Sequence, residues 1–145
     1  MHNVTSEEFF LLLEAGNCPA GLKVTGRREC IEGIAEALQS GQCPTDLTID
    51  LYDEFIGKEK IEKIASALKS GYCPVGLTID LVDNDLEAYD IQPLAEAIAS
   101  GQCPRNLTLD FSNNYINVNG IDLFARALKS GRCPSGLTLK FNSKV

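Results

Sequence analysis

A stretch of a dozen residues, SGQCPTDLTIDL at 40–51, recurs almost unchanged three more times along the chain. The later copies are SGYCPVGLTIDL from Ser70, SGQCPRNLTLDF from Ser100 and SGRCPSGLTLKF from Ser130. Cys-Pro pairs begin at Cys18, Cys43, Cys73, Cys103 and Cys133, with spacings of 25, 30, 30 and 30 residues. A fixed period of ~30 residues predicts a stack of similar units, because one such unit cannot bury its apolar surface alone.

Each unit has the pattern of a short strand followed by an amphipathic helix. The strand segments alternate apolar and polar residues, as in LTIDL at 47–51, which is typical of a strand with one buried face. The helical segments place apolar residues at i, i+3, i+4 and i+7, for example Ile61, Ile64, Ala65 and Leu68. The alternation predicts an α/β solenoid with a concave parallel β-sheet and convex helices.

The Ser-Gly-x-Cys-Pro segment is expected to end each helix. Its glycine falls where a helix end commonly needs a left-handed residue, at Gly41, Gly71, Gly101 and Gly131. The proline three residues later prevents the helix from continuing. Pro93 is instead expected near the start of a helix, where a proline ring is tolerated.

The N-terminal units depart from the pattern. TSEE at 5–8 predicts a capping box before a helix, and no strand is expected ahead of it. The next unit is shortened and has a helix of roughly 32–40. We therefore expect a single domain with a helical cap (1–17), a short repeat (18–42), three full repeats (43–72, 73–102, 103–132) and a terminal partial repeat (133–145).

Two segments resemble leucine-rich repeats. LTIDLVDNDL at 77–86 and LTLDFSNNYI at 107–116 are similar to the repeat core L-x-x-L-x-L-x-x-N-x-L. The unit length and the Cys before each strand resemble the ribonuclease-inhibitor-like subclass. The sequence motif SGxCPxxLTLDL also resembles the repeats of leucine-rich-repeat effectors of intracellular bacterial pathogens. The resemblance implies a horseshoe-shaped solenoid that binds another protein.

The asparagine of the repeat core L-x-x-L-x-L-x-x-N-x-L is present only at Asn84 and Asn114. Its side chain normally hydrogen-bonds the loop backbone of neighbouring turns. Glu29, Glu54 and Lys144 stand in that place in the other units. We therefore expect an asparagine ladder limited to the centre of the stack, with less regular turns toward the N-terminus.

Four cysteines occupy identical places in successive units, namely Cys43, Cys73, Cys103 and Cys133. Stacking should align their sulfurs in a row, whereas a zinc site needs four ligands around one point. No C-x-x-C occurs, and the only histidine is His2. We expect no metal and no disulfide, and we interpret the cysteines as small side chains buried between helix end and strand.

Composition disfavours several functional classes for this chain, namely enzymes, nucleic-acid-binding proteins and membrane-binding proteins. One histidine leaves no Ser-His-Asp or Cys-His arrangement, and no Gly-rich phosphate loop is present, so no enzyme activity and no cofactor are predicted. A net charge of −7 disfavours nucleic acid and anionic membranes as partners. Without a membrane segment or a secretory signal, we expect a cytoplasmic protein, or one delivered into a host cell by a non-Sec route.

Polar strand residues should face the concave side and align in rows across the sheet. The three predicted rows are Thr48, Thr78, Thr108; Asp50, Asp80, Asp110; and Tyr52, Val82, Ser112. Neighbouring strands lie ~4.8 Å apart, so three aspartates in a row repel one another when ionised. The aspartates are open to three interpretations: a solvated polar face, a site for acid–base chemistry or Ca²⁺, or an acidic groove for a basic partner.

Aromatic residues follow the strands at Phe55 and Tyr115, with Tyr52 nearby. Exposed aromatic side chains are enriched in binding hot spots, although partial burial in the loop fits the same positions. At the other end of the pattern, Lys140 and Lys144 suit an edge strand, because lysine discourages edge-to-edge pairing. Two copies joined at that edge are the alternative.

We therefore expect a protein–protein interaction scaffold that binds a partner through its concave acidic face, and the charge of that face favours a basic partner. The resemblance implies a bacterial effector acting on a host protein. Two alternatives stay open: the repeat region of a larger effector whose catalytic domain is absent here, and an edge-strand dimerisation module. The chain is expected to be a monomer or a weak dimer.

Overall fold

The computed structural model describes residues 3–142. The strands are β1 (Asn3–Thr5), β2 (Lys23–Thr25), β3 (Thr48–Asp50), β4 (Thr78–Asp80), β5 (Thr108–Asp110) and β6 (Thr138–Lys140). The helices are α1 (Ser6–Ala15), α2 (Ile31–Gln39), α3 (Lys58–Leu68), α4 (Ala88–Ala99) and α5 (Val118–Lys129), with a 3₁₀ turn, η1 (Arg28–Cys30), before α2.

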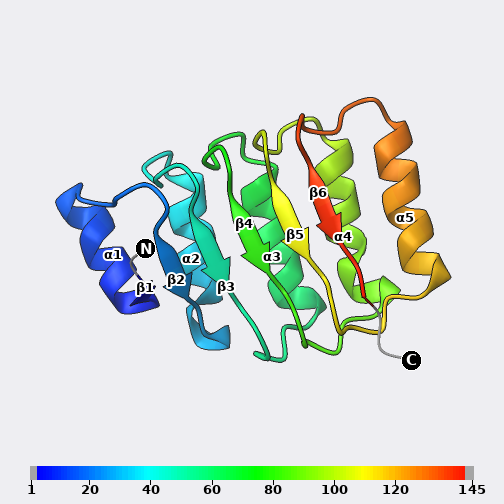
Figure 1. The fold of residues 1–145 in the computed structure, drawn as a ribbon, viewed down its shortest axis with the longest axis horizontal. Helices are drawn as coiled ribbons and strands as arrows, with labels where there is room; N and C mark the ends of the chain where they lie inside the picture. Colours follow the sequence, from blue (N-terminus) through cyan, green and yellow to red (C-terminus); the bar gives the residue numbers. More distant parts are fainter. Residues whose placement is uncertain (1–2, 143–145) are drawn as a thin grey trace.

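The strands form one parallel sheet in chain order, β1 to β6, and the helices lie together behind it (Figure 1). Each helix contacts mainly the helices before and after it. This arrangement confirms the expected α/β solenoid, in which a sheet forms one layer and helices form the other.

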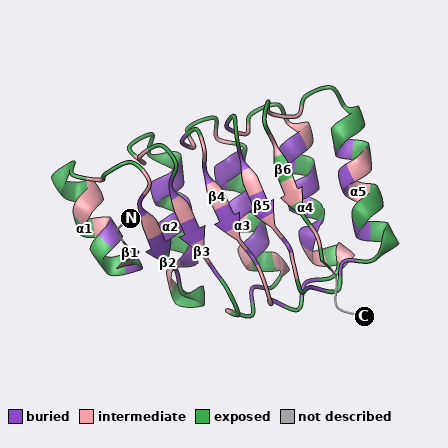
Figure 2. Ribbon diagram, in the orientation of Figure 1, coloured by how far each residue is buried: buried purple, intermediate pink, exposed green. Residues whose placement is uncertain are grey.

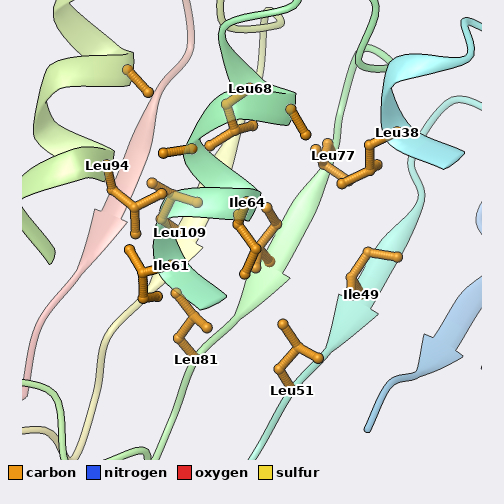
Figure 3. Packing of buried hydrophobic residues seen from close by; sticks show 14 of the residues in the cluster. Leu38, Ile49, Leu51, Ile61, Ile64, Leu68, Leu77, Leu81, Leu94 and Leu109 are labelled. Atoms are coloured by element: carbon orange, nitrogen blue, oxygen red, sulfur yellow. The ribbon is translucent and has the colours of Figure 1, made fainter. Parts of the chain in front are cut away.

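The core is a single layer between the sheet and the helices. Leu47, Ile49 and Leu51 point into it from the strand segment of the first full repeat and are at most 1% exposed. Ile61 and Ile64 of α3 meet this layer from the other side, and Figure 3 shows the two sets of side chains packed together. The two apolar periodicities of the sequence therefore meet at one interface, which stacking continues along the chain.

The Ser-Gly segment ends each helix through two contacts. The Ser40 hydroxyl donates to the Ala37 carbonyl at 2.6 Å and accepts from the Gln42 N–H at 3.1 Å, and the same pair recurs in later repeats. Gly41 then adopts a positive φ of 77°, which confirms the predicted left-handed position.

The N-terminus confirms one expectation and corrects another. Thr5 and Glu8 form the predicted reciprocal capping box, with Glu8 N–H donating to Thr5 Oγ1 at 3.1 Å and Thr5 N–H donating to Glu8 Oε1 at 2.8 Å. The absence of a strand before this helix was a wrong prediction, because β1 pairs in parallel with β2. Three residues are enough here, since the neighbouring strand supplies the pairing that gives a short segment its extended form.

Pro93 is also placed differently from the prediction. It is the sixth residue of α4, inside the helix, and it is buried. A proline there removes one i to i−4 hydrogen bond, but the helix continues to Ala99.

The asparagine ladder is present and extends further than expected. Asn84 Oδ1 accepts from the Glu54 and Ile56 N–H groups at 2.9 and 3.1 Å, and Asn114 Oδ1 does the same for Asn84 and Leu86 at 2.9 Å. Each asparagine also donates back to the previous strand end, Asn84 to Leu51 O and Asn114 to Leu81 O, both at 2.8 Å.

Glu54 continues this ladder by one turn, although it is not an asparagine. Its Oε1 accepts from the Arg28 N–H at 2.8 Å, so the longer carboxylate reaches the short first repeat. The turn that contains Arg28 is therefore hydrogen-bonded to the following repeat. Lys144, expected at the same place in the last unit, lies outside the described residues.

Replacing Asn114 by Ala should destabilise the fold strongly. The side chain is 0% exposed, and its loss leaves several buried backbone groups without partners. We expect the free energy of unfolding to fall by ~3 kcal/mol, measured by urea denaturation. Asn119→Ala, at an exposed residue of α5, is the matched control and should change it by less than ~0.5 kcal/mol. Equal effects of the two substitutions would contradict the ladder's role.

Candidate protein-binding surface

The face of the sheet opposite the helices, called here the open face, presents the polar strand residues. The strand register aligns Thr48 with Thr78 and Thr78 with Thr108, and it aligns Asp50, Asp80 and Asp110 in the same way. All six side chains are partly exposed. Those three aspartates form the aspartate row of the open face.

Each aspartate of this row also has a local structural role that the sequence reasoning missed. Its Oδ1 accepts the backbone N–H two residues later, from Tyr52 at 3.0 Å, Val82 at 2.9 Å and Ser112 at 3.0 Å. This i to i+2 bond is the turn that Asp and Asn side chains commonly make. The turn needs a side-chain oxygen but no charge, so it does not explain why all three residues are carboxylates.

The middle carboxyl of the row is the one whose pKa is perturbed. Partial burial raises the pKa of the Asp80 carboxyl, and the neighbouring Asp50 and Asp110 raise it further, while the hydrogen bond from Val82 opposes the shift. On one side, Lys23 Nζ lies 3.7 Å from Asp50 Oδ2. On the other side, Lys140 is in register with Asp110. The row is thus acidic at its centre and bounded by a lysine at each end.

The third predicted row is less uniform. Tyr52 is 54% exposed, whereas Val82 and Ser112 are partly buried. Beyond the strand ends, Phe55 is 64% exposed and Tyr115 is 47% exposed. The aromatic side chains therefore reach solvent along the loops that follow the strands, next to the open face.

Phe55 is unusual in its backbone as well as its exposure. It has a φ of +54°, a left-handed conformation that is rare for a bulky residue and costs about 1–2 kcal/mol. The following repeat places Asp85 in the same conformation, with a φ of +55°. Because the ring of Phe55 is mostly exposed, burial in the core does not account for a phenylalanine at this position. Strained residues of this kind cluster at functional sites.

Two further exposed apolar residues belong to this edge and were missed from the sequence. Tyr89, at the start of α4, is 68% exposed, and Lys58 Nζ lies 3.7 Å from the centre of its ring. Val118, the first residue of α5, is 79% exposed. Their position in the first turn of a helix, off the apolar face, was the available signal. Tyr52, Phe55, Tyr89 and Tyr115 together are called the aromatic rim.

The four aligned cysteines, called the cysteine row, form hydrogen bonds with carbonyl groups at helix ends. The Cys43, Cys73 and Cys103 thiols each donate to the carbonyl six residues earlier, at 3.3 Å, and Cys133 does so at 3.4 Å. All six cysteines of the chain are free. They are partly buried and pack against the core, as expected for small side chains between helix end and strand. Each thiol thus helps to satisfy a helix-end carbonyl.

Burial makes these thiols poor nucleophiles. It raises the pKa of Cys43 and of Cys73 to about 12 and that of Cys103 to about 11, with smaller contributions from neighbouring cysteines. Among residues 3–142, no group of three or more His, Cys, Asp or Glu side chains is arranged to hold a metal ion. In the same part of the chain, no helix has the length and apolarity required to span a membrane.

The stacked strand–helix units, their asparagine ladder and their open sheet face together define a leucine-rich-repeat-type solenoid. One of the solved structures that match, the tropomodulin C-terminal domain from Caenorhabditis elegans, has this type of fold. The match has a TM-score of 0.54 at 19% sequence identity and covers 79% of this chain. The chain spans 64% of the length of that domain's chain. No family model and no curated protein matches the sequence.

Replacing Asp80 by Asn tests the repulsion in the aspartate row. A carboxyl whose pKa is raised by folding stabilises the fold in its protonated form, and this stabilisation is lost as the pH rises through the raised pKa. Asp80→Asn keeps an acceptor for the Val82 N–H, so at pH 7 we expect stability to increase by up to about 1 kcal/mol. The gain should shrink as the pH falls and wild-type Asp80 becomes protonated. Thermal unfolding between acidic and neutral pH measures both effects.

Two matched variants complete that experiment. Asp80→Ala removes the acceptor together with the charge and should be less stable than Asp80→Asn at every pH. Glu62→Gln, on the exposed side of α3, removes one charge elsewhere and should leave stability nearly unchanged. A loss of stability in Asp80→Asn at pH 7 would show that charge repulsion at Asp80 is not significant.

The cysteine row predicts slow alkylation of the folded protein. At pH 8, Cys43 and Cys73 should react with iodoacetamide at least ~100-fold more slowly than in the denatured chain, because the thiolate is the reactive form. Quenched labelling with peptide mass spectrometry measures each cysteine separately, and the denatured chain supplies the reference rate. Similar rates in the two states would mean that the thiols ionise freely.

Proposed function

We propose that this chain is a non-catalytic scaffold that binds a protein partner through its open face. The observation that carries the proposal is the aspartate row, where three carboxylates are aligned on a sheet face that no helix of residues 3–142 covers. Their turn-forming bonds require only an oxygen acceptor, while their charges repel one another. A cationic ligand would relieve that repulsion, so charge complementarity favours a basic partner segment.

The aromatic rim supports the same proposal. Tyr52 and Phe55 lie just past the strand that carries Asp50, so a partner on the aspartate row would also meet exposed rings. Aromatic residues beside charged ones are a common composition for binding hot spots. The left-handed backbone of Phe55 adds to this support, because no burial explains the ring.

The finer proposal is that the partner is a host protein and that the chain acts as a bacterial effector. It is supported by the resemblance of the SGxCPxxLTLDL segments to effector repeats. The tropomodulin domain supports the repeat fold alone, since the identity is 19%. The role as effector is therefore independent of the binding surface, and each can be tested separately.

Binding through the aspartate row predicts that Asp50→Asn, Asp80→Asn and Asp110→Asn together abolish capture of a partner from host-cell lysate. The carboxamides keep the three turn hydrogen bonds, so a loss of capture reports on charge rather than on folding. Affinity capture followed by mass spectrometry measures the retained proteins, and a basic protein lost from the triple variant is the expected result.

The matched control removes three carboxylates from exposed helix positions by Glu32→Gln, Glu62→Gln and Glu96→Gln. This variant has the same net charge as the aspartate variant and should capture the partner like the wild type. A second variant, Phe55→Asp, introduces the residue of the next repeat and should weaken capture at least ~10-fold if the aromatic rim takes part. Equal capture by the wild type and the triple aspartate variant contradicts binding through the row.

A further inference from the structure

The two ends of the solenoid each expose an apolar face. At one end, a groove of about 560 Å³ is lined by Val4, Leu11, Leu12, Pro19 and Leu22, with Glu8 and Asn17 beside them. At the other end, a groove of about 380 Å³ is lined by Ile121, Phe124, Ala125, Leu128, Leu137, Leu139 and Phe141. These are called the leading face and the trailing face, and neither is covered within residues 3–142.

The trailing face has the composition of an internal contact between repeats. Ile121 and Leu128 are 44% and 49% exposed, whereas their equivalents one repeat earlier, Ile91 and Ile98, are 0% exposed. Figure 2 shows the same contrast between α4, which has a continuous buried side, and the more exposed α5. The residues that the next repeat would normally cover are therefore apolar and accessible here.

The leading face also has an apolar residue where the later helices have polar ones. Leu11 lies seven residues before Cys18, and the equivalent residues of the next helices are Glu36, Ser66, Glu96 and Arg126. Leu11 is 66% exposed, so a leucine replaces a polar residue on an accessible surface. Exposed apolar patches of this kind mark interaction sites.

The charges around the two faces are opposite. Residues 3–22 contain three glutamates, Glu7, Glu8 and Glu14, and no Lys or Arg. Residues 118–142 contain four basic side chains, Arg126, Lys129, Arg132 and Lys140, and one acidic side chain, Asp122. Glu7 is paired with Arg27 at 3.0 Å, and Arg126 is paired with Asp122 at 3.7 Å, so these charges are already balanced within one copy. The remaining charges are acidic at the leading face (Glu8 and Glu14) and basic at the trailing face (Lys129, Arg132 and Lys140), which makes the two faces complementary.

We propose that the trailing face of one copy of this chain binds the leading face of a second copy. Repeat equivalence defines the contact: Ala95 and Ala99 of α4 lie opposite Leu123 and Ala127 of α5. The same relation places Ala125 and Lys129 of one copy opposite Glu8 and Leu12 of the next. The sheet continues from β6 to β1 of the next copy, since these two strands are the first and last in the sheet order.

Such a contact joins different surfaces of the two copies and therefore does not close on itself. It produces a series of species that grows with concentration, rather than one dimer. This self-association uses the two ends of the solenoid, so it leaves the open face accessible and does not depend on the proposed binding function.

Sedimentation velocity over a range of concentrations tests the proposal with two end-specific variants. Leu11→Glu and Leu128→Glu each place a carboxylate in the apolar contact, and both positions are exposed in a single copy, so folding should be unaffected. Each variant alone should be monomeric. An equimolar mixture should form a 1:1 dimer and nothing larger, because one unaltered trailing face meets one unaltered leading face.

The control is Tyr72→Glu, at a residue 65% exposed in an internal repeat, which should associate like the wild type. Far-UV circular dichroism checks folding, and Leu11→Lys with Ile121→Glu replaces any variant that fails to fold. A wild type that stays monomeric up to roughly 1 mM overturns the proposal. A Leu11→Glu variant that still dimerises also overturns it, because the contact would then join two trailing faces.

Discussion

Every repeat in this chain buries its apolar surface against the repeats on either side. A strand of three residues and a helix of about three turns have too little core of their own, so stability comes from the interfaces between units. The asparagine ladder ties these interfaces together, because Asn84 and Asn114 each bond to backbone of the previous unit. The need to satisfy these interfaces sets the register between repeats, and that register determines which side chains align on the open face.

The alignment of the open face is a direct consequence of the same stacking. Once Ile49, Ile79 and Leu109 share a row in the core, the aspartates next to them must share a row on the opposite face. Repetition thus concentrates like charge at the middle of the sheet, where Asp80 has a raised pKa. Under the proposed function, a basic partner would gain binding free energy from the aspartate row and from the exposed aromatic rings.

The predictions from sequence succeeded where the signal was periodic and failed where it was local. Glu54 was expected to interrupt the ladder. Its carboxylate oxygen instead accepts from the Arg28 N–H and continues the ladder into the short repeat. β1 was missed because three residues contain no recognisable period, and its pairing with β2 is a tertiary effect. The cysteines lie between helix end and strand as expected, but the bonds from their thiols to helix-end carbonyls were not predicted.

The sequence by itself determined the strand–helix unit, the parallel order of the units and the face on which each residue lies, because periods of two, 3.6 and 30 residues act along the chain. Only the tertiary structure decided how the units meet: the turn bonds of the aspartates, the exposure of Phe55 and Tyr89, and the opposite charges of the two end faces. The exposure of these side chains depends on packing between residues that are distant in sequence. The aspartate turn bonds are local, but the strand register across repeats aligns the three turns on one face.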